Sequence, residues 1–125
     1  MDQDRLRRPP RERFAGVERV FDLGALFAGL ASESVERQGH MQKTVYKHGR
    51  LTSAVFAFER AGRLERHRVE GEAVLLVLEG ELEVAVDGEK RRVAGGQMML
   101  LDPGVEHEIE ARERSQVVMH VVLEG

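Results

Sequence analysis

Short apolar segments separated by turn residues dominate the chain from residue 41 onward. Turn glycines recur at short, even intervals, at Gly62, Gly71, Gly80, Gly88, Gly95, Gly96 and Gly104. Evenly spaced short strands with glycine between them are typical of a β-sandwich or β-barrel. The expected strands, rich in valine and leucine, are Leu51–Glu59, Ala73–Leu78, Leu82–Val86, Gln97–Leu101, His107–Ala111 and Gln116–Leu123.

The segment 82–86 alternates apolar and polar positions, as a strand with one buried face does. Leu82, Val84 and Val86 are expected to point inward, with Glu81, Glu83 and Asp87 facing water. Asp87-Gly88 follows directly. This dipeptide is a strong signal for a tight hairpin into the next strand.

Two strands do not alternate. Residues 74–78 and 117–123 are apolar on both faces, apart from His120. An antiparallel strand with one wet face should alternate, so both strands are expected to be covered on two sides. The second cover would be an N-terminal helix or a partner subunit, and a homodimer is therefore expected.

The N-terminal region differs from the rest of the chain. Apolar side chains in Phe21–Ala31 follow a helical spacing at Leu23, Leu26, Phe27 and Leu30, with Asp22 placed as the N-cap. Residues 1–13 hold two prolines, five arginines and little to bury, so they are expected to be disordered. The predicted organisation is a disordered arm (1–13), a short helix and linker (14–40) and a β-barrel domain (41–125).

Composition narrows the classes of function. The chain has 125 residues, of which 42% are hydrophobic and 33% charged, with a net charge of -3 and no cysteine or tryptophan. These values indicate one soluble globular domain and exclude disulfides and thiolate metal sites. A negative net charge and a single tyrosine argue against nucleic acid. Neither a membrane helix nor a secretion signal is recognisable, so a cytoplasmic protein is expected.

Two segments resemble the paired sequence motifs of the cupin superfamily. The first runs from Gly62 through His67 to Gly80, and the second from Gly95 through Pro103 to His107. The resemblance covers about residues 43–123 and is closest to small single-domain cupins. It implies a single jelly-roll β-barrel, an all-β fold, here preceded by a short helix. It also implies a homodimer, in which the segment 45–50 or the helix would be added to the partner's sheet.

The resemblance also implies a metal site, which is incomplete in this sequence. In metal-binding cupins two histidines and a glutamate of the first motif join a histidine of the second. His67 and His107 match two of these positions, whereas Val69 and Ala73 stand at the other two. Glu72 is one residue from the glutamate position, and such an offset turns a strand side chain to the other face. The possible third ligands are Glu72, His40, His48, His120 or water.

Other candidate residues have simpler interpretations. His120 lies among apolar strand residues and is expected to be a core histidine. His40 and His48 flank the first strand and are expected at the surface. Met98 and Met99 are expected to fill space in a core strand, and the three glutamates that alternate with apolar positions around His107 should face water, at Glu106, Glu108 and Glu110.

Three arginines surround His67, at Arg63, Arg66 and Arg68. They could hold a carboxylate or phosphate at the barrel mouth, or form a solvated loop paired with Glu65 and Glu70. No phosphate loop, dinucleotide motif or nucleophile elbow is present, and no serine has a local catalytic setting.

Two functions therefore remain. The first is a cupin that binds a small molecule in a polar pocket around His67 and His107, with no catalysis assigned. The second is an enzyme of the dioxygenase, isomerase or lyase type. It would use a divalent ion (Fe, Mn, Ni or Zn) held by His67, His107 and a third ligand.

Overall fold

Nine strands and one helix make up the part of the chain that the structure describes, which is residues 18–31 and 39–124 of a computed structural model. The predicted disordered arm, residues 1–13, lies outside the described residues. In chain order the elements are α3 (Leu23–Ala31), β1 (His40–His48), β2 (Leu51–Phe58), β3 (Arg63–His67), β4 (Gly71–Glu79), β5 (Glu81–Val86), β6 (Glu89–Ala94), β7 (Met98–Leu101), β8 (His107–Ala111) and β9 (Ser115–Leu123).

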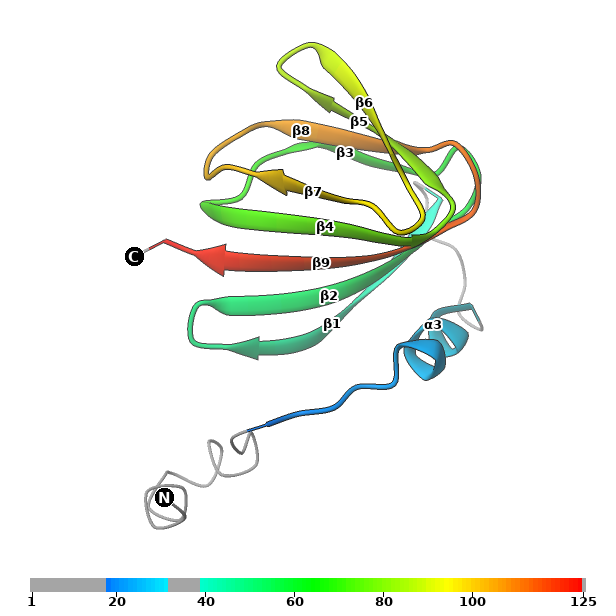
Figure 1. The fold of residues 1–125 in the computed structure, drawn as a ribbon, viewed down its shortest axis with the longest axis vertical. Helices are drawn as coiled ribbons and strands as arrows, with labels where there is room; N and C mark the ends of the chain where they lie inside the picture. The colour runs from blue at the N-terminus through cyan, green and yellow to red at the C-terminus, as the bar shows by residue number, and fades with distance from the viewer. Residues whose placement is uncertain (1–17, 32–38, 125) are drawn as a thin grey trace.

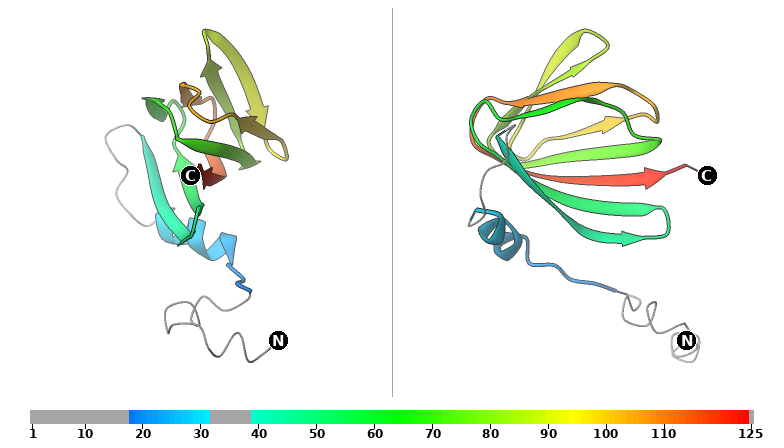
Figure 2. Two further views of the ribbon diagram at one scale, coloured as in Figure 1. Left: turned by 90° about the vertical axis from the view of Figure 1, so that its left-hand side faces the viewer. Right: turned by 180° about the vertical axis from the view of Figure 1, so that it is seen from behind.

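The strands form two antiparallel sheets that face each other (Figures 1 and 2). The five-stranded sheet has the order β1-β2-β9-β4-β7, and the four-stranded sheet has the order β3-β8-β5-β6. Most neighbours are distant in the sequence, as in β9, which pairs with β2 and β4. The predicted all-β barrel is confirmed.

Apolar side chains from both sheets fill the space between them. The inner cluster includes Phe56 and Met119 from one sheet and Leu82, Val84 and Ile109 from the other. Leu82 and Val84 have no exposed surface, in agreement with the predicted alternation. The hairpin at Asp87-Gly88 is also confirmed, with φ of 51° and 79°. Positive φ at both central residues is typical of a type I′ turn.

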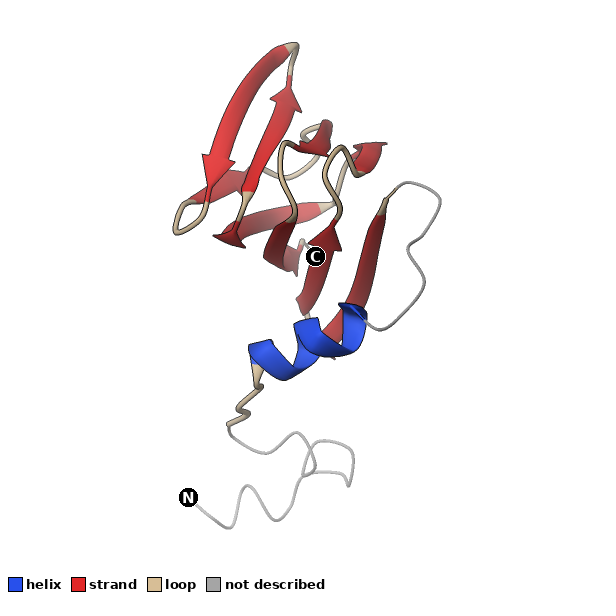
Figure 3. Cartoon of the chain, turned by 90° about the vertical axis from the view of Figure 1, so that its right-hand side faces the viewer, coloured by secondary structure: helices blue, strands red, loops and turns tan. Residues whose placement is uncertain are grey.

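Helix α3 covers one part of the outer face of the five-stranded sheet (Figure 3). It begins as predicted, because the Asp22 Oδ1 atom accepts a hydrogen bond of 3.0 Å from the Ala25 backbone nitrogen. Phe27 and Leu30 then pack against Val55 and Val118. The helix therefore provides the second cover predicted for β9. No helix in the described ranges is long and apolar enough to span a bilayer.

The sequence pattern gave no bounds for strands β3 and β6, nor for β1. The sequences of β3 and β6, RLERH and EKRRVA, are mostly charged, and each lies at an edge of the four-stranded sheet. Only Val93 of β6 is fully buried. Pairing with β8 and β5, rather than intrinsic apolar alternation, makes these segments strands.

Candidate functional site

His67 and His107 meet at one end of the four-stranded sheet. His67 lies at the end of β3 and His107 at the start of β8, and the two are partners in the strand register. Their ring centroids lie 4.2 Å apart at an interplanar angle of 60°. The two candidate histidines are therefore brought together, although 40 positions separate them in the chain.

A bulge in β3 makes this meeting possible. Leu64 pairs with Ile109, and the next pair is His67 with His107, so two residues of β3 oppose one residue of β8. Leu64 packs against the inner cluster. Even alternation from Leu64 would place Arg66 beside it, whereas the extra residue brings His67 to that position.

Each imidazole is oriented by a backbone carbonyl of its own strand region. The His67 Nδ1 atom lies 3.0 Å from the Glu65 oxygen, and the His107 Nδ1 atom lies 3.2 Å from the Val105 oxygen. A carbonyl oxygen can only accept, so both Nδ1 atoms donate. In a neutral ring of this tautomer, Nε2 carries a lone pair and acts as an acceptor or a metal ligand.

The His107 ring is almost fully buried, with 2% of its surface exposed. Its Nε2 atom is buried and has no hydrogen-bond partner. Burial lowers the pKa of His107 from 6.5, the Val105 hydrogen bond opposes this shift, and the nearby His67 lowers the pKa further. His107 is therefore neutral at pH 7, with an unsatisfied acceptor.

A cavity of about 230 Å³ borders His107 near the β5–β6 turn. Its charged lining residues are Arg66, Asp87, Glu106 and Glu108. Of the three arginines around His67, only Arg66 lines this cavity. Arg63 lines a different one, and Arg68 is exposed and pairs with Glu70 at 3.9 Å. Ala85 and Glu108 pair in the strand register and alternate with the inward-facing Val84 and Ile109, so this cavity lies on the outer face of the four-stranded sheet.

The proposed third ligands lie elsewhere. Glu72 and His48 are exposed on strands of the five-stranded sheet. Among the described residues, no group of three or more histidine, aspartate or glutamate side chains could hold a metal ion. Two imidazoles are fewer protein ligands than structural or catalytic zinc sites use. The side chains around His67 and His107 therefore do not fit a tightly held resident metal.

The surface position predicted for His40 is wrong. Its ring is 5% exposed and lies 5.5 Å from the Phe58 ring. Its Nδ1 atom contacts the Arg63 carbonyl oxygen at 2.9 Å, and its Nε2 atom contacts the Gln42 side-chain oxygen at 3.0 Å. Each ring nitrogen of His40 thus has a partner, and this buried histidine joins β1 of one sheet to β3 of the other.

The core position predicted for His120 is also wrong. The residue is half-buried on the outer face of the five-stranded sheet, where its Nδ1 atom lies 2.7 Å from the Ser53 hydroxyl oxygen. Ser53 has no recognisable partner nearby in the sequence, because 67 positions separate it from this histidine. Met98 is likewise exposed rather than buried, whereas Met99 packs against the inner cluster. Glu106 and Glu110 are exposed, as expected.

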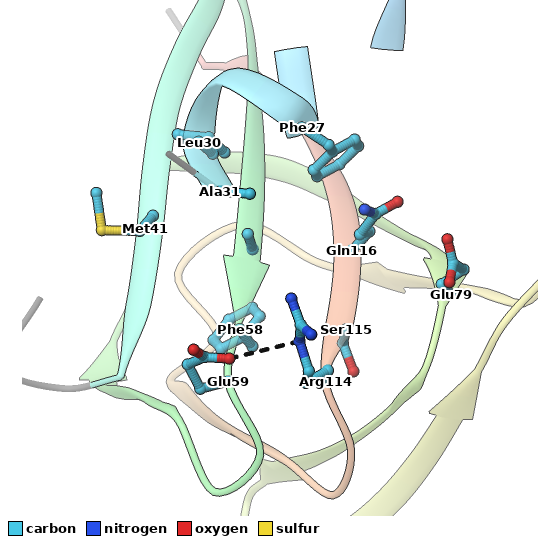
Figure 4. A pocket seen from close by; sticks show the side chains of 11 residues that line it. Phe27, Leu30, Ala31, Met41, Phe58, Glu59, Glu79, Arg114, Ser115 and Gln116 are labelled. Atoms are coloured by element: carbon cyan, nitrogen blue, oxygen red, sulfur yellow. Dashed lines mark ion pairs between the residues drawn. The ribbon is translucent and has the colours of Figure 1, made fainter. Parts of the chain in front are cut away.

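A further cavity of about 370 Å³ lies beside the C-terminal end of α3 (Figure 4). Phe27, Leu30 and Met41 supply apolar walls, and an ion pair of 3.5 Å joins Glu59 to Arg114 at its border. Among the described residues that line it, every fully buried polar side-chain atom has a hydrogen-bond partner. The described part of this cavity therefore presents no buried unsatisfied group to a ligand.

Comparison with known proteins gives a family and a set of similar structures. The family described as "Cupin domain" matches residues 54–123. A conserved protein of unknown function from Streptococcus pyogenes is 27% identical, with a TM-score of 0.69 over 86% of this chain and 89% of that chain. A cupin superfamily protein from Desulfitobacterium hafniense is 19% identical, with a TM-score of 0.71 over 86% and 93%.

KdgF from a Halomonas species is 26% identical, with a TM-score of 0.66 over 74% of this chain and 87% of that chain. No curated protein matches this sequence. The similar structures agree on the fold and span chains of comparable length.

Proposed function

The chain belongs to the cupin family, and from this premise we propose that it binds a small polar molecule at His67 and His107. The observation that best supports this proposal is the buried Nε2 atom of His107, which has no hydrogen-bond partner. A buried acceptor without a partner costs about 1–3 kcal/mol, which a bound hydrogen-bond donor would recover.

The surroundings favour a particular ligand chemistry. Nε2 of the neutral His107 ring accepts a hydrogen bond, so the ligand must donate one. A neutral ring gives no positive charge to pair with an anion, which supports an uncharged or cationic molecule. Small polyols, sugars and amines meet both conditions.

A metal-dependent enzyme is the weaker candidate. An iron, manganese, nickel or zinc ion would supply Lewis-acid or redox chemistry when bound, and His67 and His107 would offer it two nitrogens. The donor set lacks a third protein ligand among the described residues. The ligand-binding function is therefore better supported.

The test is a titration of the histidine ring signals by NMR with a panel of small polyols, sugars and amines. At least one compound should shift the His67 and His107 signals together, with one saturation curve. The variant His107→Leu should abolish the response. Because Leu replaces an unsatisfied polar group with an apolar one, its melting temperature should stay close to that of the unchanged protein.

Independent responses of the two rings, or binding that survives His107→Leu, would contradict the proposal. Elemental analysis of the untagged protein, purified without chelator, separates the two candidates. About one equivalent of metal that disappears in His107→Ala would favour the enzyme. A substoichiometric amount that the substitution leaves unchanged would favour the binding protein.

A further inference from the structure

A second cavity lies on the outside of the barrel, away from His67 and His107. It has a volume of about 340 Å³ and is bounded by residues 18–23 and by outward-facing side chains of β1, β2 and β9. In Figure 1 residues 18–22 form the blue segment that precedes α3. His67 and His107 belong to the other sheet. The two sites are therefore physically separate.

A hydrogen-bonded pair of polar side chains lines this cavity. Ser53 of β2 and His120 of β9 are partners in the strand register, and the Ser53 Oγ and His120 Nδ1 atoms lie 2.7 Å apart. Their chain neighbours Ala54 and Met119 pack against the inner cluster, so Ser53 and His120 point to the outer face.

The His120 ring still has hydrogen-bonding capacity. Among the described residues, Ser53 is its only hydrogen-bond partner. If the Ser53 hydroxyl donates to Nδ1, then Nε2 carries the ring proton and can donate; in the other tautomer Nε2 accepts. A ligand group that both donates and accepts, such as a hydroxyl, therefore matches either state of the ring.

The rest of the wall is mostly apolar. Phe21 and Leu23 come from the N-terminal segment, and Val45, Tyr46 and Leu51 come from β1 and β2. The Phe21 and Tyr46 rings lie 6.2 Å apart, within the range of aromatic contacts. An apolar wall with a few convergent polar groups is the usual composition of a small-molecule site.

The volume of the cavity and the charges of its lining limit the class of ligand further. The volume of about 340 Å³ lies at the small end of ligand sites, which run from about 300 to 1,000 Å³. One acidic and one basic residue, Glu18 and Arg19, line the cavity, so the formal charges balance. The lining therefore gives no net preference for an anion or a cation.

We propose that this outer cavity binds a small uncharged aromatic or aliphatic molecule with one hydroxyl group. The apolar body of the ligand lies against Phe21, Leu23 and Tyr46. Its hydroxyl group donates a hydrogen bond to His120 Nε2 or accepts one from it, according to the tautomer. Ser53 orients the His120 ring through Nδ1. This site is independent of the function proposed for His67 and His107.

The test uses 4-methylphenol as the probe and toluene as its matched analogue without the hydroxyl. Titration of the full chain with 4-methylphenol should shift the His120 ring signals by NMR along a saturable curve. Toluene should bind about tenfold more weakly, the usual effect of one lost hydrogen bond. This comparison needs no variant and so does not depend on any substitution folding.

Variants then locate the site. His120→Phe keeps an aromatic ring but removes the nitrogens, so 4-methylphenol should bind about tenfold more weakly and no better than toluene. Leu51→Trp should fill the cavity and prevent binding of both probes. Arg91→Gln is the control, because Arg91 is exposed on β6 of the other sheet and lies outside this cavity.

Several results would overturn the proposal. These are a response that does not saturate, equal affinities for the two probes, binding that persists in folded Leu51→Trp, or shifts at His67 and His107 instead of His120. A loss of binding in Arg91→Gln would also overturn it, since it would place the probes on the four-stranded sheet.

Discussion

At the scale of single residues, the buried Nε2 atom of His107 is the most informative group in the chain. Its ring is held by the Val105 carbonyl at 3.2 Å, yet its second nitrogen has no partner. His40 is equally buried, but the structure places an oxygen within 3.0 Å of each of its ring nitrogens. The contrast distinguishes a buried histidine with partners at both ring nitrogens from one with an unpartnered nitrogen.

His107 also makes stability depend on pH. Burial lowers its pKa in the folded chain below the unfolded value of about 6.5. As pH falls below about 6.5, the unfolded chain takes up a proton that the folded chain does not, so the free energy of unfolding decreases. Urea denaturation between about pH 7 and pH 5 should show a steeper loss for the unchanged protein than for His107→Leu. Parallel curves would contradict this.

At the scale of elements, the strand connections depend on glycine for two different reasons. Gly80, between β4 and β5, has φ of 91°, and a Cβ there would lie 2.2 Å from the Ser115 hydroxyl oxygen. Gly88, in the β5–β6 hairpin, has φ of 79° but open space around it. The first position requires both the backbone conformation and the absence of a side chain, whereas the second requires only the conformation.

Alanine at the two positions should therefore have unequal effects. Gly88→Ala should lower the free energy of unfolding by about 1–2 kcal/mol, the cost of a left-handed conformation. Gly80→Ala adds a collision with β9 and should cost about 1–3 kcal/mol more. Chemical denaturation of both variants measures the difference. Equal losses would mean that the β4–β5 turn relaxes to accept a side chain.

At the scale of the whole molecule, the two outer sheet faces differ in chemistry. The four-stranded sheet presents ion pairs such as Lys90–Glu83 at 3.8 Å and Arg92–Glu81 at 3.5 Å. On the five-stranded sheet, the edge strand β7 exposes 64% of Met98 and 69% of Leu100. Val74 and Leu76 pair with these residues, which extends the apolar surface onto β4. We call these four residues the β7 patch.

The β7 patch supports the expected homodimer, because exposed apolar edges are usually covered in stable proteins. We predict a dimer at micromolar concentration, measured by light scattering. Leu100→Glu should shift it to monomer without lowering the melting temperature of the fold by more than a few degrees. Arg91→Glu, on exposed β6, is the control and should leave the dimer intact. A monomer in the unchanged protein would remove the basis for this prediction.

Short-range sequence patterns were sufficient to predict much of the architecture. Alternation placed Leu82 and Val84 in the core, Asp87-Gly88 marked the hairpin, and Asp22 capped α3. Each of these depends on residues only two to four positions apart, within the reach of strand, turn and helix periodicity. The paired motifs were likewise sufficient to indicate the cupin family and to single out His67 and His107.

Only the tertiary structure decided which side chains meet. The bulge in β3 aligns His67 with His107, strand pairing brings Ser53 to His120, and packing between Phe56 and Phe58 buries His40. These contacts join segments far apart in the chain, and a shift of one residue in register would turn each side chain to the opposite face. No short-range pattern specifies that register. The sequence by itself therefore determined the fold and the candidate residues, whereas strand register determined the sites they form.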